Sequence, residues 1–197
     1  MKAIFLDIDG VLNCYATNKD ICSKSRCQNY IGIDKDKTKR LARIVKETNA
    51  ILILSSSWKI GWEPNKKYNN PDDTILYYHA KYLNNHLKKK GKLFITDKTR
   101  ERDLYYRGAG IKSYLNLHPE ITDWIVLDDE IFIDFQEEGI IPHLIKINPI
   151  YGLTDDDAEA AIKMLNNQII GPYNVDPHFE TYITQYKKAG PANKKEK

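Results

Sequence analysis

The chain has 197 residues, of which 42% are hydrophobic, and its 30 basic and 27 acidic side chains give a net charge of +3. This length favours a single domain with a sizeable core, and the ordinary apolar content excludes a disordered chain and a collagen-like repeat. No window approaches the run of about 18 apolar residues that a membrane span needs, and Asp7 interrupts the N-terminus too early for a signal peptide, so we expect a cytoplasmic protein without a membrane segment.

Apolar runs of strand length alternate with segments of helical periodicity, which is typical of an α/β fold with a mainly parallel sheet. In chain order, the pattern predicts a strand at residues 2–8, a helix at 34–48, a strand at 51–54, a helix at 72–90, a strand at 92–96, a helix at 111–117, strands at 124–127 and 144–147, and a helix at 155–170. Asp34 and Thr154 are the expected N-caps of the first and last helices. We therefore predict one domain over residues 1–171 and a C-terminal extension, residues 172–197, that is basic and partly disordered.

The three cysteines, Cys14, Cys22 and Cys27, fall in one short segment. Their odd number argues against a disulfide framework. They form no C-x-x-C pair and have no histidine nearby, which argues against a zinc site. We expect reduced thiols in a loop.

Two pairs of acids interrupt or end apolar strands. Asp7 and Asp9 lie just before Gly10, and side chains at i and i+2 share one face of a strand, so both could address one ligand. Asp128 and Asp129 end a second apolar run. Carboxylates from two strand ends repel each other unless a cation lies between them, and oxygen ligands suit Mg²⁺. A solvated strand end or a turn is the alternative for each pair, but together they predict a metal site beside a carboxylate that can accept a phosphoryl group.

Hydroxyl and basic side chains complete this set. Ser55 and Ser56 follow the second strand, where their hydroxyl and N–H groups could hold phosphate oxygens. A transferring phosphoryl group also needs a cation near its oxygens. The candidate cations are Arg107, Lys98, Lys59 and Lys112. Each of these residues alone is an ordinary loop or surface residue, so the prediction depends on the set.

Five sequence blocks carry a family resemblance: FLDIDGVLN, ILILSSSWK, YRGAGIKSYL, WIVLDDE and HLIKINPIYGLTDDDAEAAIKMLN. As a set they resemble the haloacid dehalogenase-like (HAD) phosphohydrolases, and most specifically the HAD domain also found in multidomain "Swiss army knife" RNA repair proteins. The blocks run from residue 4 to about residue 167. The resemblance implies a three-layer α/β/α HAD-like (Rossmann-like) fold with a minimal cap and an Mg²⁺-dependent phosphatase that works through an aspartyl phosphate.

The resemblance also assigns roles to the acids. Asp7 matches the nucleophile. Asp9 matches the general acid/base, whose backbone carbonyl joins the Mg²⁺ shell. Asp128 and Asp129 match the metal-binding acids of the fourth motif, so the implied metal ligands are Asp7, Asp9, Asp128 and Asp129.

Two phosphate-binding positions stay open at this level. The triple serine lets either Ser55 or Ser56 be the hydroxyl of the second motif. The cation of the third motif is Arg107, within Arg107-Gly108, or its competitor Lys98. All four are therefore candidate phosphate-binding residues.

The charge distribution points to an anionic partner. Residues 1–112 carry 23 basic and 12 acidic side chains, whereas residues 113–197 carry 7 and 15. The segment between Asp9 and the helix at 34–48 is too short for a large cap, which leaves the site open to a bulky substrate. The clusters expected to contact phosphates or bases are Lys19, Lys24, Arg26, Lys66, Lys67, Lys88 to Lys90, and Tyr68, Tyr77, Tyr78 and Tyr82. We therefore predict a phosphatase of phosphorylated RNA or DNA ends; the alternatives are a small nucleotide or sugar phosphatase and a non-catalytic phosphate-binding or phospho-relay module.

Overall fold

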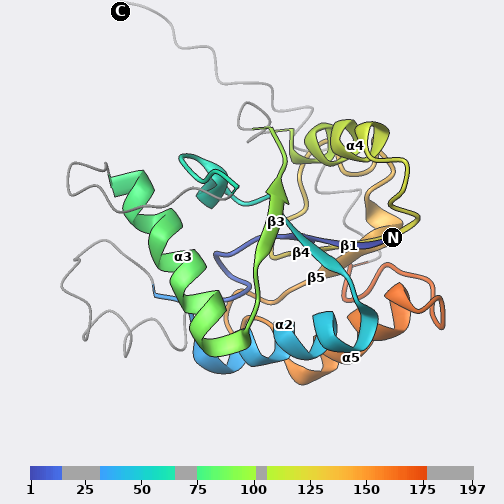
Figure 1. Ribbon diagram of the computed structural model, residues 1–197. Helices are drawn as coiled ribbons and strands as arrows, with labels where there is room; N and C mark the ends of the chain where they lie inside the picture. Colours follow the sequence, from blue (N-terminus) through green and yellow to red (C-terminus); the bar gives the residue numbers. More distant parts are fainter. Residues whose placement is uncertain (15–31, 65–74, 101–105, 177–197) are drawn as a thin grey trace, which may run out of the picture.

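Five parallel strands form one sheet in the order β3-β2-β1-β4-β5. The computed structural model describes residues 1–14, 32–64, 75–100 and 106–176, without the side chains of residues 75–78 (Figure 1). The strands are β1 (Lys2–Leu6), β2 (Ile51–Leu54), β3 (Ile95–Lys98), β4 (Asp123–Asp128) and β5 (Leu144–Lys146). The helices are α2 (Lys35–Thr48), α3 (Ile75–Gly91), α4 (Arg107–Leu117) and α5 (Asp155–Leu165), with short 3₁₀ helices η1 (Ser57–Lys59) and η2 (Ile141–His143).

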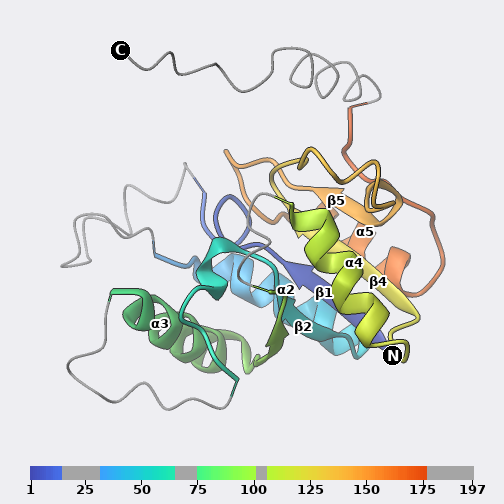
Figure 2. The same cartoon turned by 90° about the horizontal axis from the view of Figure 1, so that it is seen from above.

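The sheet lies between two helical layers, as Figures 1 and 2 show. Residues of α2, α3 and α5 pack on one face, against Ile4 and Leu6 of β1. Residues of α4 pack on the other face, against Ala3 and Phe5. Strands covered on both faces read as continuous apolar runs, which is why the sequence pattern located them. The predicted three-layer α/β fold is confirmed, and the described sheet is parallel throughout.

The strand order places a topological switch point between β1 and β4. From β1 the chain proceeds through β2 and β3 to one edge of the sheet, and it then returns to place β4 and β5 on the other side of β1. Leu6 pairs with both Leu54 and Leu127, so β1, β2 and β4 end at the same level. Open α/β sheets bind ligands in the crevice beyond the strand ends at such a point. The predicted site residues after these strands are therefore neighbours.

Helix caps account for most of the helix boundaries. The Asp34 carboxylate accepts hydrogen bonds from the N–H groups of Asp36 and Lys37, as an N-cap does. Thr154 and Asp157 form a reciprocal capping box at the start of α5. This last helix ends at Leu165 rather than residue 170, because Asn166 closes it and Asn167 adopts a left-handed conformation with φ of 56°.

The predicted strand at residues 92–96 is displaced, because its first residues close helix α3. Lys92 has φ of 55°, and its N–H bonds to the carbonyl of Lys88. The N–H of Leu93 bonds to the carbonyl of Leu87. These bonds satisfy carbonyl groups at the helix end, so β3 begins only at Ile95.

Helix α4 begins at Arg107, four positions before the predicted start at residue 111. The side chain of Tyr106 makes no capping hydrogen bond. Instead, the Asp134 carboxylate accepts a hydrogen bond of 2.8 Å from the N–H of Ala109. A Cβ on Gly108 would lie 3.0 Å from that carboxyl carbon, so glycine permits the close approach. A cap from a residue so distant in sequence leaves no local pattern.

The C-terminal part of the described chain returns to the sheet. The N–H of Tyr173 bonds to the carbonyl of Leu144, and its carbonyl accepts from the N–H of Lys146. The predicted domain boundary at residue 171 and the predicted disordered tail stay predictions, and residues 177–197 lie outside the described residues. Within the described ranges, no helix has the length and apolar character to cross a membrane.

Candidate active site

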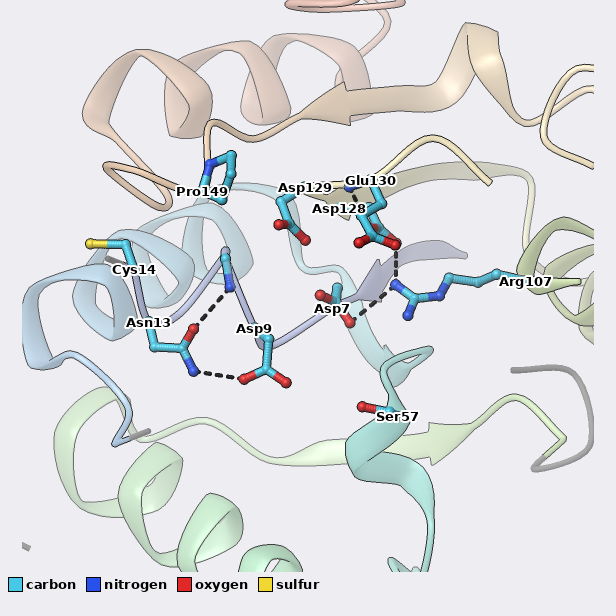
Figure 3. A pocket seen from close by; sticks show the side chains of 11 residues that line it. Asp7, Asp9, Asn13, Cys14, Ser57, Arg107, Asp128, Asp129, Glu130 and Pro149 are labelled. Atoms are coloured by element: carbon cyan, nitrogen blue, oxygen red, sulfur yellow. Dashed lines mark hydrogen bonds and ion pairs between the residues drawn. The ribbon is translucent and has the colours of Figure 1, made fainter. Parts of the chain in front are cut away.

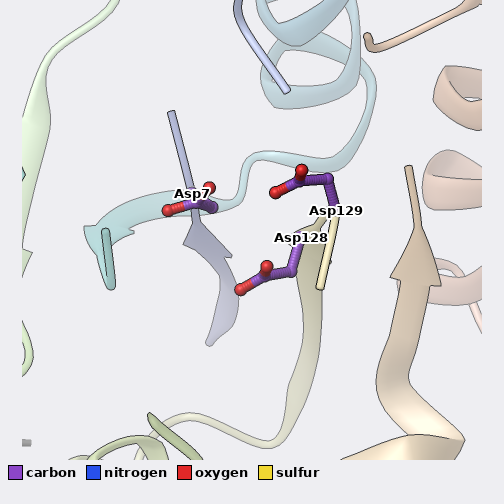
Figure 4. A group of neighbouring side chains, drawn as sticks. All are labelled: Asp7, Asp128 and Asp129. Carbon is purple, nitrogen blue, oxygen red and sulfur yellow. The ribbon is translucent and has the colours of Figure 1, made fainter. Parts of the chain in front are cut away.

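Three acids meet at the switch point. Asp7 directly follows β1 and Asp128 is the last residue of β4, and both are buried, with 5% and 0% exposure. Asp129 comes next and is half-buried. One carboxylate oxygen from each of the three lies within 4.8 Å of the others (Figure 4). The structure thus brings together three of the four predicted metal ligands through their side chains.

Burial makes these negative charges costly. Loss of water raises the pKa of Asp7 to about 7, and the neighbouring charge of Asp128 adds to the rise. Burial likewise raises the pKa of Asp128 to about 6 against the opposing effect of Arg107. The pKa of Asp129 also rises to about 6, mainly through burial and then through the charge of Asp7. The cluster therefore carries negative charge that the folded chain only partly balances.

Arg107 is the cation that faces the cluster. Its Nη1 atom lies 3.0 Å from Oδ1 of Asp7 and also donates to Oδ2 of Asp128. Its guanidinium carbon lies 4.1 Å from the ring centre of Phe132, which holds the planar group in place. The Nζ atom of Lys98 does not contact the three acids and instead donates to the carbonyl of Trp62 and to the Glu63 carboxylate. The geometry thus places Arg107, and not its competitor, beside the predicted nucleophile.

The three serines after β2 occupy different positions. The N–H of Ser55 donates a hydrogen bond to the carbonyl of Leu6, which extends the pairing of β2 with β1. The buried hydroxyl of Ser55 has no hydrogen-bond partner among the described residues. Ser56 is the N-cap of η1, and a hydrogen bond from its hydroxyl lowers the pKa of Asp7 against the larger effect of burial. Ser57 lines the pocket (Figure 3). The sequence prediction named only Ser55 and Ser56, although the run of three serines also indicated Ser57.

Asp9 lies apart from the other acids. Its Oδ1 accepts a hydrogen bond of 2.8 Å from the amide of Asn13, and its Oδ2 accepts one of 2.9 Å from the indole of Trp58. Figure 3 shows Asp9 and Arg107 on opposite sides of Asp7. The Asp9 side chain is not part of the three-acid cluster.

A pocket of about 320 Å³ opens above these groups. Its lining residues are Asp7, Asp9, Gly10, Asn13, Cys14, Ser57, Arg107, Asp128, Asp129, Glu130 and Pro149. Cys14 is buried and forms no disulfide with a described residue, and Cys22 and Cys27 lie outside the described residues. Sequence reasoning did not identify Asn13, Glu130 or Pro149, since their position depends on loops that meet only in the folded chain.

Gly10 permits the two acidic loops to approach each other. Its φ is +72°, and a Cβ there would lie 2.3 Å from the carboxyl carbon of Asp129. Gly10→Ala should therefore lower the free energy of unfolding by more than the roughly 1–2 kcal/mol that a left-handed alanine costs. Gly139→Ala is the matched control, because Gly139 has φ of +68° and no atom within 4 Å of the added Cβ. Equal losses for the two variants in urea unfolding would contradict the contact with Asp129.

Comparison with known protein families identifies a relationship. A family model described as "HAD domain in Swiss Army Knife RNA repair proteins" matches residues 3–158. This range includes the five strands apart from Lys2, the three clustered acids and Arg107. No curated protein and no solved structure matches the chain significantly.

Proposed function

Because the chain belongs to the family of HAD domains in Swiss Army Knife RNA repair proteins, as its motifs predicted, we propose that it is an Mg²⁺-dependent phosphatase that forms an aspartyl phosphate on Asp7. The observation that carries this proposal is the buried cluster of Asp7, Asp128 and Asp129 beside a buried arginine. Phosphoryl transfer depends on positioned charges more than on elaborate covalent chemistry. A purely structural role would leave three clustered acids, two of them buried, without sufficient compensation.

The residues divide the chemistry between them. A carboxylate oxygen of Asp7 attacks phosphorus, the bond from phosphorus to the leaving oxygen breaks, and Asp9 donates a proton to that oxygen. Asp9 then accepts a proton from water, which attacks the aspartyl phosphate, releases inorganic phosphate and restores Asp7. Arg107 lies on the side of Asp7 opposite Asp9, and its positive charge stabilises the negative charge on the phosphoryl oxygens.

The three clustered acids fit a divalent cation. All three offer oxygen ligands, which Mg²⁺ prefers, and these oxygens lie close together. Burial raises the pKa of each of them, and Arg107 contacts only two of the three. When bound, Mg²⁺ would supply positive charge for the carboxylates and the phosphoryl oxygens. Asp7, Asp128 and Asp129 would hold it through their side chains, with the backbone carbonyl of Asp9 as the fourth predicted ligand.

We infer that the substrate is a phosphorylated RNA or DNA end, and helix α3 supports this substrate class. Its sequence contains four lysines and no acid. A groove of about 310 Å³ on this helix is lined by Lys81, Tyr82, Asn85, His86, Lys89 and Lys90. His79, near the start of α3, stacks on Trp58, which contacts Asp9. An α-helix rises 1.5 Å per residue, so the last lysine of α3, Lys90, lies about 16 Å along the helix from His79. A bound nucleic-acid strand can therefore run along α3.

Two aromatic residues on loops next to the pocket also suit an end of a nucleic acid. Tyr106 precedes Arg107 and is 62% exposed, and Tyr151 follows the pocket-lining Pro149 by two residues and is 61% exposed. Exposed aromatic rings provide stacking surfaces for unpaired bases. Tyr82, by contrast, packs partly against the core. Tyr68, the side chains of Tyr77 and Tyr78, and the predicted clusters Lys19, Lys24, Arg26, Lys66 and Lys67 lie outside the described part of the chain.

The test compares chain lengths of substrate and two matched double variants. With Mg²⁺, the protein should dephosphorylate 3′- or 5′-phosphorylated oligonucleotides with a higher kcat/KM than mononucleotides. Lys81→Gln/Lys89→Gln should lower kcat/KM for the oligonucleotide alone and should reduce the salt dependence of binding by a slope of about 2. Lys46→Gln/Lys163→Gln removes two surface charges from α2 and α5 and should change neither value.

The alternative functions predict different results in the same experiment. Equal or better turnover of mononucleotides would indicate a small-molecule phosphatase. Binding of phosphate without any turnover would indicate a non-catalytic phosphate-binding or phospho-relay module. An oligonucleotide preference that survives in the α3 double variant would place the strand on another surface.

A further inference from the structure

Both oxygens of the Asp9 carboxylate accept hydrogen bonds, and the donors are two residues to which the family resemblance assigns no role. The side-chain amide of Asn13 donates to Oδ1, and the indole Nε1 of Trp58 donates to Oδ2, at 2.8 and 2.9 Å. Asn13 is itself fixed, because its Oδ1 accepts a hydrogen bond from the N–H of Gly10 and its side chain is 1% exposed. The Asn13 orientation is thus set by the turn that follows Asp9.

Trp58 is fixed by contacts with two other elements. Its backbone N–H donates to the hydroxyl of Ser56 at the start of η1. Its ring stacks on the imidazole of His79 from α3, with 5.3 Å between ring centres and 27° between planes. The residue is 8% exposed. Trp58 therefore links the loop after β1, the turn after β2 and helix α3 at the position of one carboxylate.

We propose that Trp58 and Asn13 are positioning residues that hold the Asp9 carboxyl on the leaving-group side of the pocket. The inference rests on the proposed function, because it assigns a task to the residues around its acid/base. Asp9 is linked to Asp7 through a single residue, and a cation held by the other acids would attract any nearby carboxylate. Two fixed donors oppose rotation of Asp9 into the cluster and keep its carboxyl on the side of Asp7 opposite Arg107.

The leaving group distinguishes this role from a structural one. In the first step, the bond from phosphorus to the leaving oxygen breaks and the proton moves from Asp9 to that oxygen. An alkoxide from a nucleoside or a simple alcohol needs this proton, whereas p-nitrophenolate leaves as a stable anion without it. A displaced general acid should therefore slow this first step selectively for alkyl phosphates. The step is measured by kcat/KM, which covers the events up to release of the leaving group, whereas kcat also contains the hydrolysis of the aspartyl phosphate that all substrates share.

Trp58→Phe removes the N–H donor and keeps an aromatic ring against His79. We expect kcat/KM for an alkyl or nucleoside phosphate to fall by about 10- to 100-fold, and kcat/KM for p-nitrophenyl phosphate to stay within about twofold. Asn13→Asp should show the same selectivity, because it replaces the donor to Asp9 with an acceptor of the same shape. Asp9→Asn sets the reference for complete loss of the acid.

Trp62→Phe is the matched control. Trp62 is 2% exposed and its Nε1 donates to the side chain of Asn84, also on α3, so this variant likewise removes one buried indole hydrogen bond to a neighbouring element. It should leave the ratio of the two kcat/KM values unchanged. If Trp58→Phe slows both substrates equally while Asp9→Asn is selective, the positioning role is wrong and the proposed function stands. If Asp9→Asn is not selective, the acid role of Asp9 fails and the inference fails with it.

Discussion

Asp7→Asn should abolish phosphatase activity, with kcat reduced by roughly a factor of 10⁴ or more. The carboxamide has nearly the shape of the carboxylate, but its oxygen is a poor nucleophile and cannot form an acyl phosphate. Acid quenching of the parent protein with a radiolabelled phosphate ester and Mg²⁺ should trap a hydroxylamine-sensitive phosphoprotein. The Asp7→Asn protein should yield none.

The same substitution should leave the fold intact and even stabilise it without metal. Burial raises the pKa of Asp7 to about 7, so its negative charge at pH 8 costs the folded state free energy. A neutral amide removes that cost, and we expect a higher melting temperature for the variant in EDTA at pH 8. Asp36→Asn is the control, since Asp36 is exposed on α2 and its carboxylate pairs with Lys39, an exposed residue of the same helix. Retention of parental kcat by Asp7→Asn would remove the nucleophile assignment altogether.

The acids of the site could be predicted because they are charged residues at the ends of apolar strands. Asp7 and Asp128 end apolar strands that are buried on both faces, and buried carboxylates need a partner or a ligand. Parallel strands adjacent to the switch point bring such ends together whatever the loops do. Leu6 pairs in register with both Leu54 and Leu127, so the serines that follow β2 lie beside the same acids.

The surroundings of these acids depend on contacts that leave no local signal. Arg107 faces the cluster because Asp134 caps α4 from a position 25 residues later, so sequence reasoning had to keep Lys98 as a competitor. Asn13 and Trp58 likewise read as a loop residue and a core residue until both contact Asp9. Tertiary hydrogen bonds between remote segments have no sequence period, and they decide side-chain orientation.

Mg²⁺ should stabilise the protein strongly at pH 8 and only weakly at pH 5. The carboxyls of Asp7, Asp128 and Asp129 have ordinary pKa values of 3.8, and burial raises them to about 7, 6 and 6. They bind protons more tightly in the folded chain than in the unfolded chain, so their contribution to stability is fully present below about pH 4 and is lost as the pH rises through 6 to 7. A cation replaces those protons at pH 8, whereas at pH 5 protons compete with it.

Melting temperature measured across this pH range, in EDTA and in excess Mg²⁺, tests the expectation. At 100 times the dissociation constant, Mg²⁺ contributes about 2.7 kcal/mol to folding. Asp129→Asn is the sharpest variant, because Arg107 contacts Asp7 and Asp128 but makes no contact with Asp129. It should lose most of the Mg²⁺-dependent gain and flatten the pH dependence in EDTA, while Asp36→Asn keeps both. A gain from Mg²⁺ that is equal at pH 5 and pH 8, or that persists in Asp129→Asn, would mean that the cation binds away from these carboxylates.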